Sequence, residues 1–379
     1  MTQKIRVMLV DDSAVIRGMY DRTLSADGAF EVVATAANGQ IAINILAKTP
    51  VDVIVLDVEM PVMDGITALP ELLKLAPKTR VIMASTLTQR NAEISVRAMQ
   101  LGASDYIPKP SSKEPTEVAE FYRSLIAKVK ALAPHVRYES ATNAAGVSTA
   151  SPSHAHASAP SEASVAPSRL YEPLPTLKTP VRMLSQPPLG VQALAIASST
   201  GGPQALLQVF REFSGRTLRV PIFITQHMPP NFTAILADHI AKASGQDCHE
   251  GKDGELVQAG KIYLAPGDYH MLVVKDGGQL RIRLNQEPAE NFCRPSADPM
   301  FRSIAKVYGD KVLGAVLTGL GADGARGAYE LVSAGGVVVS QDEATSVVYG
   351  MPKAVADAKL TSAVLPITQV APFLIKAVC

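Results

Sequence analysis

The feature that most constrains the fold of this chain is a low-complexity stretch near its middle. From residue 140 to residue 168 nearly every residue is Ser, Ala, Pro, Thr or His, and no periodic apolar pattern runs through it. Such a segment cannot bury enough apolar surface to offset the entropy lost on ordering, so we expect a flexible tether. The 379 residues therefore divide into two domains, 1–130 and 189–379, joined by a Ser/Ala/Pro-rich linker at 131–188.

Composition excludes several classes of protein. The chain is 47% apolar with a net charge of +1, which indicates folded cores and gives no broad basic surface for nucleic acid. Its three cysteines fit neither a disulfide framework nor a zinc site, which favours a reducing compartment. The N-terminus lacks a signal-peptide pattern, and no uninterrupted apolar run reaches the roughly 18 residues of a membrane helix. We expect a soluble, cytoplasmic protein that is not membrane-embedded.

Both domains show the alternation of short apolar strands and helical patterns that is typical of α/β folds. The first has strand-like runs at residues 5–10, 30–34, 53–56, 81–83 and 105–107, which predicts a five-stranded parallel sheet. The second has them at 193–197, 221–225, 261–265, 312–318 and 336–340. It adds a hairpin-like stretch at 273–284 that turns at 276–278. We predict a doubly wound α/β domain with an antiparallel hairpin.

Acidic residues stand at the strand ends of the first domain. Asp11 and Asp12 end the first strand and Asp57 ends the third, so their carboxylates should share one crevice, where Mg²⁺ would offset their repulsion. Lys109 and Ser85 lie at two other strand ends, where a positive charge and a hydroxyl would bind an anion beside the metal. The alternative is that Asp12 and Ser13 only cap a helix and Asp57 only opens a turn. The combination favours a cation and anion site.

These motifs resemble the receiver domain of two-component response regulators, a flavodoxin-like (βα)5 fold. The match runs in order over about 120 residues, through Val10-Asp11-Asp12-Ser13, the segment from Leu56 to Gly65, and Lys109-Pro110. The resemblance implies that Asp57 accepts a phosphoryl group from a partner histidine kinase. It implies that Asp12, Asp57 and the Glu59 carbonyl bind Mg²⁺, with Asp11 assisting through water. It also implies that Ser85 and Tyr106 change position on phosphorylation.

A second constellation lies in the other domain. Ser199 follows an apolar strand and precedes Thr200-Gly201-Gly202 and a helical pattern, so its hydroxyl should lie near N–H groups able to stabilise an oxyanion. His227 follows the next strand, and Asp323 lies in a glycine-rich loop after a later one. Each alone fits a structural role, such as a helix cap. Together they predict a nucleophile, a base and an orienting acid.

These residues complete a resemblance to the catalytic domain of chemotaxis protein-glutamate methylesterases. The resemblance implies hydrolysis of glutamate methyl esters on chemoreceptors with release of methanol, deamidation of receptor glutamines, no cofactor in this domain, and activation by phosphorylation of the receiver. Five positions depart from the family pattern, namely Ala197-Ser198, Leu320, Ala322 and Cys293. The motifs that carry the match are Ser199-Thr200-Gly201-Gly202, Gln226-His227-Met228, Tyr263 to Asp268, Arg294 to Asp298, Leu317-Thr318-Gly319 and Asp323-Gly324.

Two other functions stay open, and a third is disfavoured. The second domain could bind a partner or anion without reacting, or it could be an esterase in a parallel pathway outside chemotaxis. A DNA-binding output domain would need a recognition helix in a basic setting, and the sequence offers none.

Overall fold

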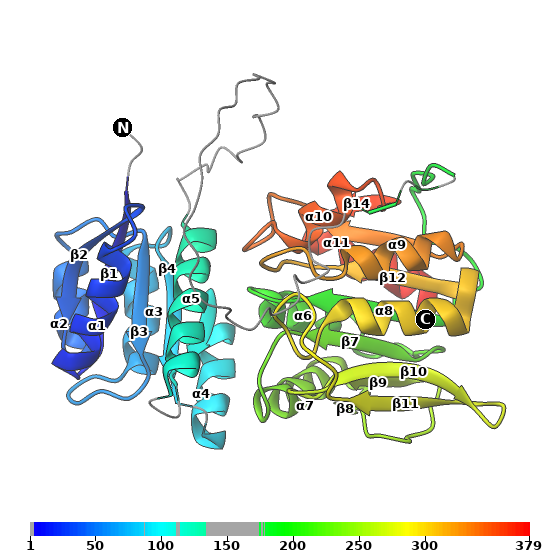
Figure 1. Ribbon diagram of the computed structural model, residues 1–379, viewed down its shortest axis with the longest axis horizontal. Helices are drawn as coiled ribbons and strands as arrows, with labels where there is room; N and C mark the ends of the chain where they lie inside the picture. The colour runs from blue at the N-terminus through cyan, green and yellow to red at the C-terminus, as the bar shows by residue number, and fades with distance from the viewer. Residues whose placement is uncertain (1–3, 87, 111–113, 134–173, 176, 178) are drawn as a thin grey trace, which may run out of the picture.

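The computed structural model describes residues 4–86, 88–110, 114–133, 174–175, 177 and 179–379 (Figure 1). The tether predicted at 140–168 lies outside these described residues. In the described part of the chain, two α/β units lie side by side, the first blue to cyan and the second green to red (Figure 1).

The first unit has a five-stranded parallel sheet in the order β2-β1-β3-β4-β5. The predicted parallel α/β fold is confirmed. The central strand is β3, and all five of its residues are buried. This burial explains why its sequence is an unbroken apolar run that ends in Asp57. The strands are β1 (Ile5–Val10), β2 (Phe30–Ala36), β3 (Val53–Asp57), β4 (Arg80–Ser85) and β5 (Asp105–Pro108).

Short polar side chains start four of the five helices of this unit. Ser13, Asn38, Asp64 and Thr88 each accept a hydrogen bond from a backbone N–H in the first helical turn. Asp12 is therefore not the cap of the first helix, because Ser13 takes that place. The helices are α1 (Ala14–Ser25), α2 (Gly39–Leu46), α3 (Gly65–Leu75), α4 (Gln89–Gln100) and α5 (Pro115–Leu132).

The second unit has a seven-stranded parallel sheet in the order β14-β13-β12-β6-β7-β9-β8. The apolar pattern of the sequence does not predict β8 or β14, the two edge strands. They have four and three residues and carry no long apolar run, because an edge strand is buried on fewer sides. The strands are β6 (Ala193–Ser198), β7 (Ile222–Gln226), β8 (Asp247–Glu250), β9 (Lys261–Leu264), β12 (Val312–Val316), β13 (Val337–Gln341) and β14 (Ala363–Leu365).

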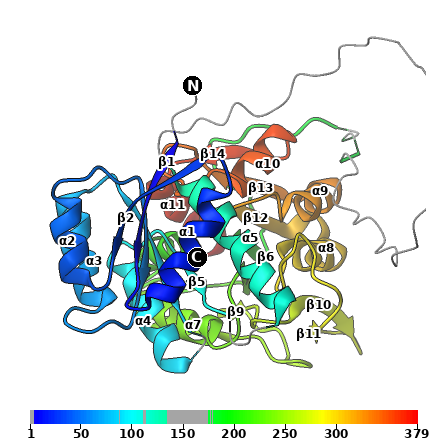
Figure 2. The same cartoon turned by 60° about the vertical axis from the view of Figure 1, so that its left-hand side comes forward.

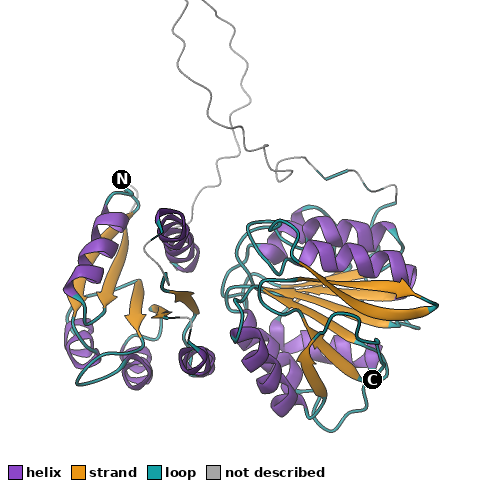
Figure 3. Ribbon diagram, turned by 60° about the horizontal axis from the view of Figure 1, so that its bottom comes forward, coloured by secondary structure: helices purple, strands orange, loops and turns teal. Residues whose placement is uncertain are grey.

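The predicted antiparallel hairpin is confirmed as β10 (His270–Asp276) and β11 (Gln279–Asn285). Its two-residue turn is Gly277-Gly278, and both glycines have positive φ, which suits this tight connection. Helices cover both faces of the large sheet (Figure 3). They are α6 (Gly202–Arg211), α7 (Phe232–Ser244), α8 (Ala297–Tyr308), α9 (Ala325–Ser333), α10 (Met351–Asp357) and α11 (Ile367–Val378), with a short 3-10 helix at Gly309–Lys311.

The two units meet where α4 packs against α6 and α7 (Figures 1 and 2), and residues of α5 and β5 also contact the second unit. The Tyr106 ring of β5 stacks on the Phe232 ring of α7, with centroids 4.6 Å apart. The last part of the segment assigned to the linker lies against the second unit, since the Leu184 N–H donates to the Ser362 carbonyl at 2.8 Å. The interface therefore includes a buried aromatic stack and brings β5 close to the second unit.

Candidate active site and acidic site

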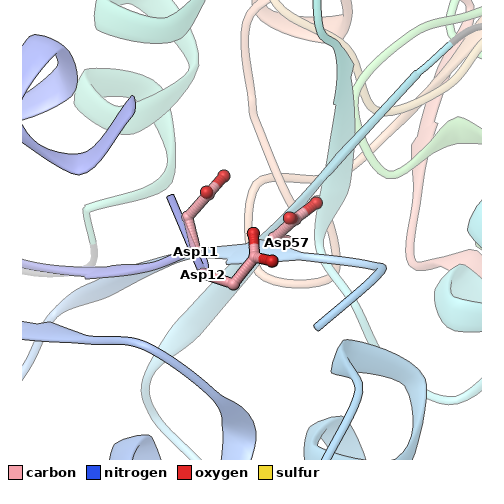
Figure 4. Close-up of side chains that lie close together, drawn as sticks. All are labelled: Asp11, Asp12 and Asp57. Atoms are coloured by element: carbon pink, nitrogen blue, oxygen red, sulfur yellow. The ribbon is translucent and has the colours of Figure 1, made fainter. Parts of the chain in front are cut away.

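Three carboxylates meet at the carboxyl end of the first sheet. Asp11 and Asp12 follow β1 and Asp57 ends the adjacent strand β3. One oxygen from each of the three lies within 4.8 Å of the others (Figure 4). Asp11 and Asp57 are buried, whereas Asp12 is exposed. The set of hard oxygen donors, open on one side, fits Mg²⁺.

Lys109 supplies the positive charge of this site. Its Nζ lies 2.8 Å from Oδ2 of Asp11 and 2.8 Å from Oδ1 of Asp57. Burial raises the pKa of Asp57 to about 6, although the Lys109 charge and hydrogen bond lower it, and the charge of Asp11 raises it further. The cluster therefore carries a cost of repulsion and desolvation that a bound cation would reduce.

The other predicted members of this site lie around it. Glu59 and Asp12 line a cavity of about 380 Å³ beside the carboxylates. The Ser85 hydroxyl is buried and shares a 3.0 Å hydrogen bond with the Ser95 hydroxyl of α4. Tyr106 is buried against α7 and therefore does not face the carboxylates in this arrangement. Ser85 therefore contacts α4, and Tyr106 lies at the surface that meets the second unit.

The candidate nucleophile lies at the carboxyl end of β6. Ser199 follows the last strand residue, and its N–H donates to the Thr318 carbonyl after β12 at 3.0 Å. Gly201 has φ of +75°, and a Cβ there would lie 2.5 Å from Val347. A Cβ on Gly202 would lie 2.0 Å from Oε1 of Gln226. Both glycines are therefore needed for the turn that leads from Ser199 into α6.

His227 and Asp323 form a close pair. Nε2 of His227 lies 2.7 Å from Oδ2 of Asp323, and these side chains are 10% and 1% exposed. Burial favours the neutral acid, but the His227 hydrogen bond and charge and the surrounding donors lower the pKa of Asp323 to about 2. The donors other than His227 are the side chains of Asn291 and Ser296 and the N–H groups of Ala297, Asp298 and Gly324. Asp323 is thus a fixed, ionised partner for the imidazole.

The second nitrogen of His227 contacts a cysteine. Nδ1 lies 3.3 Å from Sγ of Cys293. Among the hydrogen bonds of the described residues, none joins the Ser199 hydroxyl to His227. Burial opposes protonation of the ring, but Cys293 and Asp323 outweigh burial and raise the pKa of His227 to about 10. The structure brings the predicted base and acid together and adds a thiol in hydrogen-bond range.

Several polar residues of the site are not singled out from the sequence. Gln226 connects two strand ends, because its Oε1 accepts from Ser198 Oγ at 2.7 Å and its Nε2 donates to the Ser199 carbonyl at 2.9 Å. Asp298 is buried beside Asp323, and burial together with the Asp323 charge raises its pKa. Both lie inside matched motifs, which is the signal that could have identified them.

Residues of the first unit contact the rim of this site. The Thr200 hydroxyl donates to Oδ2 of Asp105 at 2.6 Å, and the same carboxylate oxygen accepts from Lys128 Nζ at 2.5 Å. Gln204 of α6 donates to the carbonyls of Met99 and Ala103. The Arg123 guanidinium lies 4.9 Å above the Phe292 ring, beside Cys293. The loops on both sides of the candidate nucleophile are therefore in contact with the first unit.

Comparisons with known proteins agree with this two-part organisation. Residues 7–119 match the family model described as a response regulator receiver domain, and residues 194–374 match the one described as CheB methylesterase. Protein-glutamate methylesterase/protein-glutamine glutaminase 1 of Paramagnetospirillum magneticum is 48% identical over 99% of this chain and 96% of its own length. The protein of the same activity from the group 2 operon of Rhodospirillum centenum is 52% identical over 98% of this chain and 93% of its own.

A solved structure of one part is also similar. The crystal structure of the Thermotoga maritima CheB methylesterase catalytic domain is 35% identical, covers 50% of this chain and 99% of that chain, and has a TM-score of 0.48. Within the described residues, none of the helices is both long enough and apolar enough to span a bilayer.

Proposed function

This chain belongs to the family of protein-glutamate methylesterases/protein-glutamine glutaminases that carry a receiver domain, and from that premise we propose how its two sites work together. The enzyme hydrolyses glutamate methyl esters on chemoreceptors with release of methanol, and it deamidates receptor glutamines. Its substrates are the cytoplasmic parts of methyl-accepting chemoreceptors, its phosphodonor is a histidine kinase, and it works in the cytoplasm. The His227–Asp323 pair at the end of two strands that flank Ser199 carries this proposal.

Ser199 is the nucleophile. Because Asp323 holds Nε2 of His227, Nδ1 is the ring nitrogen that accepts the Ser199 proton. The Ser199 oxygen attacks the ester or amide carbonyl, and His227 returns the proton to the leaving methanol or ammonia. Water then attacks the glutamyl-enzyme by the same route. For these reaction steps to occur, Nδ1 must separate from Cys293, and the His227 ring must be neutral.

The turn after Ser199 provides the oxyanion donors. Within the described residues, the N–H groups of Thr200 and Gly201 donate to no other group, whereas the Gly202 N–H donates to the Ser199 carbonyl at 2.7 Å. Free N–H groups beside the nucleophile stabilise the negative charge of a tetrahedral intermediate. We assign Thr200 and Gly201 to this role and Gly202 to holding the turn.

In the receiver, Asp57 accepts the phosphoryl group and Lys109 binds it. Mg²⁺, held by Asp11, Asp12, Asp57 and the Glu59 carbonyl, would neutralise charge between the carboxylates and the incoming phosphoryl oxygens. Ser85 and Tyr106 respond to the new charge. Since Tyr106 and Asp105 both contact the second unit, a shift of β5 weakens the contact beside Ser199.

The boundaries of the parts follow from these assignments. We place the receiver at 1–130, with its last helix α5 ending at Leu132, the linker up to residue 188, and the catalytic domain at 189–379. The linker keeps the receiver close to the active site after the contact is broken.

Methanol release from methylated chemoreceptor membranes tests the assigned nucleophile. Ser199→Ala should lower turnover by about 10⁶-fold if the three residues act as a unit. Ser198→Ala is the matched control, because Ser198 is buried and its hydroxyl donates to Gln226 rather than facing substrate. It should keep most of the activity. Loss in Cys293→Ala with retention in Ser199→Ala would contradict the assignment.

A further inference from the structure

The proposed mechanism leaves one nucleophile of the active site unused. Cys293 lies on the loop before α8, and its Sγ is 3.3 Å from Nδ1 of His227. The other ring nitrogen is 2.7 Å from Asp323. A thiol, an imidazole and a carboxylate therefore form a continuous chain of contacts, which is the arrangement that activates a cysteine.

We propose that Cys293 is a modification site, at which a peroxide oxidises the thiol to a sulfenic acid and thereby silences the esterase. The proposal rests on the proposed function for its effect on activity, but not for the reactivity of the sulfur. The basis of the proposal is the contact between Cys293 Sγ and Nδ1 of His227. Nδ1 is the ring nitrogen that must accept the Ser199 proton in the serine mechanism.

The reaction balances with the groups present and one peroxide. His227 takes the thiol proton, and the sulfur attacks one peroxide oxygen as the O–O bond breaks. The sulfur loses two electrons, the peroxide gains them, and the leaving hydroxide takes the proton from His227 to become water. The product carries an oxygen beside His227, where it competes with the Ser199 hydroxyl for Nδ1.

The surroundings of the three cysteines predict that the peroxide oxidises Cys293 in preference to the other two. Cys248 is buried, and burial and the charges of Asp247 and Asp238 raise the pKa of its thiol. Burial also raises the pKa of Cys379. Cys293 is half-buried, and its neighbour Phe292 is 71% exposed. Among the described residues, Cys293 is the one cysteine in hydrogen-bond range of a histidine, which can take its proton.

Mass spectrometry of the full chain tests the reactivity without relying on esterase activity. The chain is treated at pH 7 with limiting iodoacetamide, and the labelling rate is measured for each cysteine. Cys293 should react at least about tenfold faster than Cys248 and Cys379, and His227→Gln should slow it about tenfold. Equal rates at Cys293 and Cys379, or no effect of His227→Gln in a folded variant, would overturn the proposal.

Treatment with hydrogen peroxide tests whether oxidation of Cys293 silences the esterase. Methanol release should fall in step with formation of sulfenic acid at Cys293 and return after dithiothreitol. Cys293→Ala should resist the same treatment, while Cys379→Ala should remain as sensitive as the unmodified chain. Inactivation of Cys293→Ala at the unmodified rate would overturn the link to Cys293. If no methanol is released before treatment, the proposed function fails, and the labelling rates still decide the reactivity of Cys293.

Discussion

The hydroxyl of Thr200, one residue after the proposed nucleophile, donates a 2.6 Å hydrogen bond to the carboxylate of Asp105 in the receiver. Asp105 begins β5, the strand that also carries Tyr106 and leads to Lys109 of the acidic site. A single short strand thus joins Lys109, which we propose binds the phosphoryl group, to the loop that follows the proposed nucleophile. This relationship explains how a change at Asp57 can reach Ser199 without a long path.

Weakening this bond should activate the enzyme in the absence of phosphodonor. Asp105→Asn removes the charge from a hydrogen bond worth about 1.5 kcal/mol or more, so basal methanol release should rise by up to about tenfold. Asp27→Asn is the control, because Asp27 also pairs with a lysine of α5, Lys130, but not at the interface. Equal basal rates in the two variants would show that the Asp105 contact does not restrain the site.

The acid limb of the pH profile should depend on Cys293. His227 must be neutral to accept a proton, so a raised pKa moves activity to higher pH. Cys293 is a cause of the rise to about 10, and Cys293→Ala should therefore lower the apparent pKa in kcat/KM by about one unit or more. Cys248→Ala should leave the profile in place. A shift of the Cys293→Ala profile to higher pH would contradict this account.

Asp323→Asn should cost about 10⁴-fold in kcat, because the neutral amide no longer orients and stabilises the imidazolium. It also replaces an acceptor of several hydrogen bonds by a group with one acceptor oxygen. Assays of methanol release at fixed times give kcat, and thermal unfolding measures the loss of stability. Asp268→Asn, which removes a partly exposed partner of Arg294, is a milder control. Similar kcat values for the two variants would count against the role of Asp323.

Gly202→Ala should destabilise the catalytic domain. The added methyl group would lie 2.0 Å from Oε1 of Gln226 and 2.9 Å from Ser198 Cβ, and overpacking of this kind costs about 1–3 kcal/mol. Gly18→Ala, in α1 and with nothing within 4 Å, should leave stability unchanged or raise it. Calorimetric unfolding compares the two. An unchanged Tm for Gly202→Ala would mean that the turn adjusts easily.

Asp12→Asn should weaken Mg²⁺ binding, measured by titration calorimetry, because it removes one of three converging carboxylates. The control is Asp21→Asn, since Asp21 pairs with Ser25 on the outer face of α1. Binding as tight in Asp12→Asn as in Asp21→Asn would place the metal elsewhere.

Sequence pattern alone predicts most of the architecture, because parallel strands buried on both faces appear as apolar runs that end in polar residues. The ends of β6, β7 and β12 place Ser199, His227 and Asp323 at the carboxyl end of the sheet, whereas the order of the strands in the sheet is known only from the structure. The edge strands β8 and β14 escape prediction because their burial is incomplete and their sequences are short.

What the sequence does not predict are contacts between distant loops. Cys293 and His227 are separated by 66 positions, and Thr200 and Asp105 by 95 positions in different domains. Neither contact repeats with a helical or strand period, so no local pattern carries it. Cys293 is visible in the sequence as a departure from the family, but its place against Nδ1 requires the fold.

The most direct test of the account measures methanol release from methylated chemoreceptor membranes, with and without a small phosphodonor and Mg²⁺, for the unmodified chain, Ser199→Ala and Asp57→Ala. We expect release that requires Ser199 and that rises with phosphodonor when Asp57 is present, and no rise in Asp57→Ala. Stimulation of Asp57→Ala equal to that of the unmodified chain, or release that persists in Ser199→Ala, would contradict it.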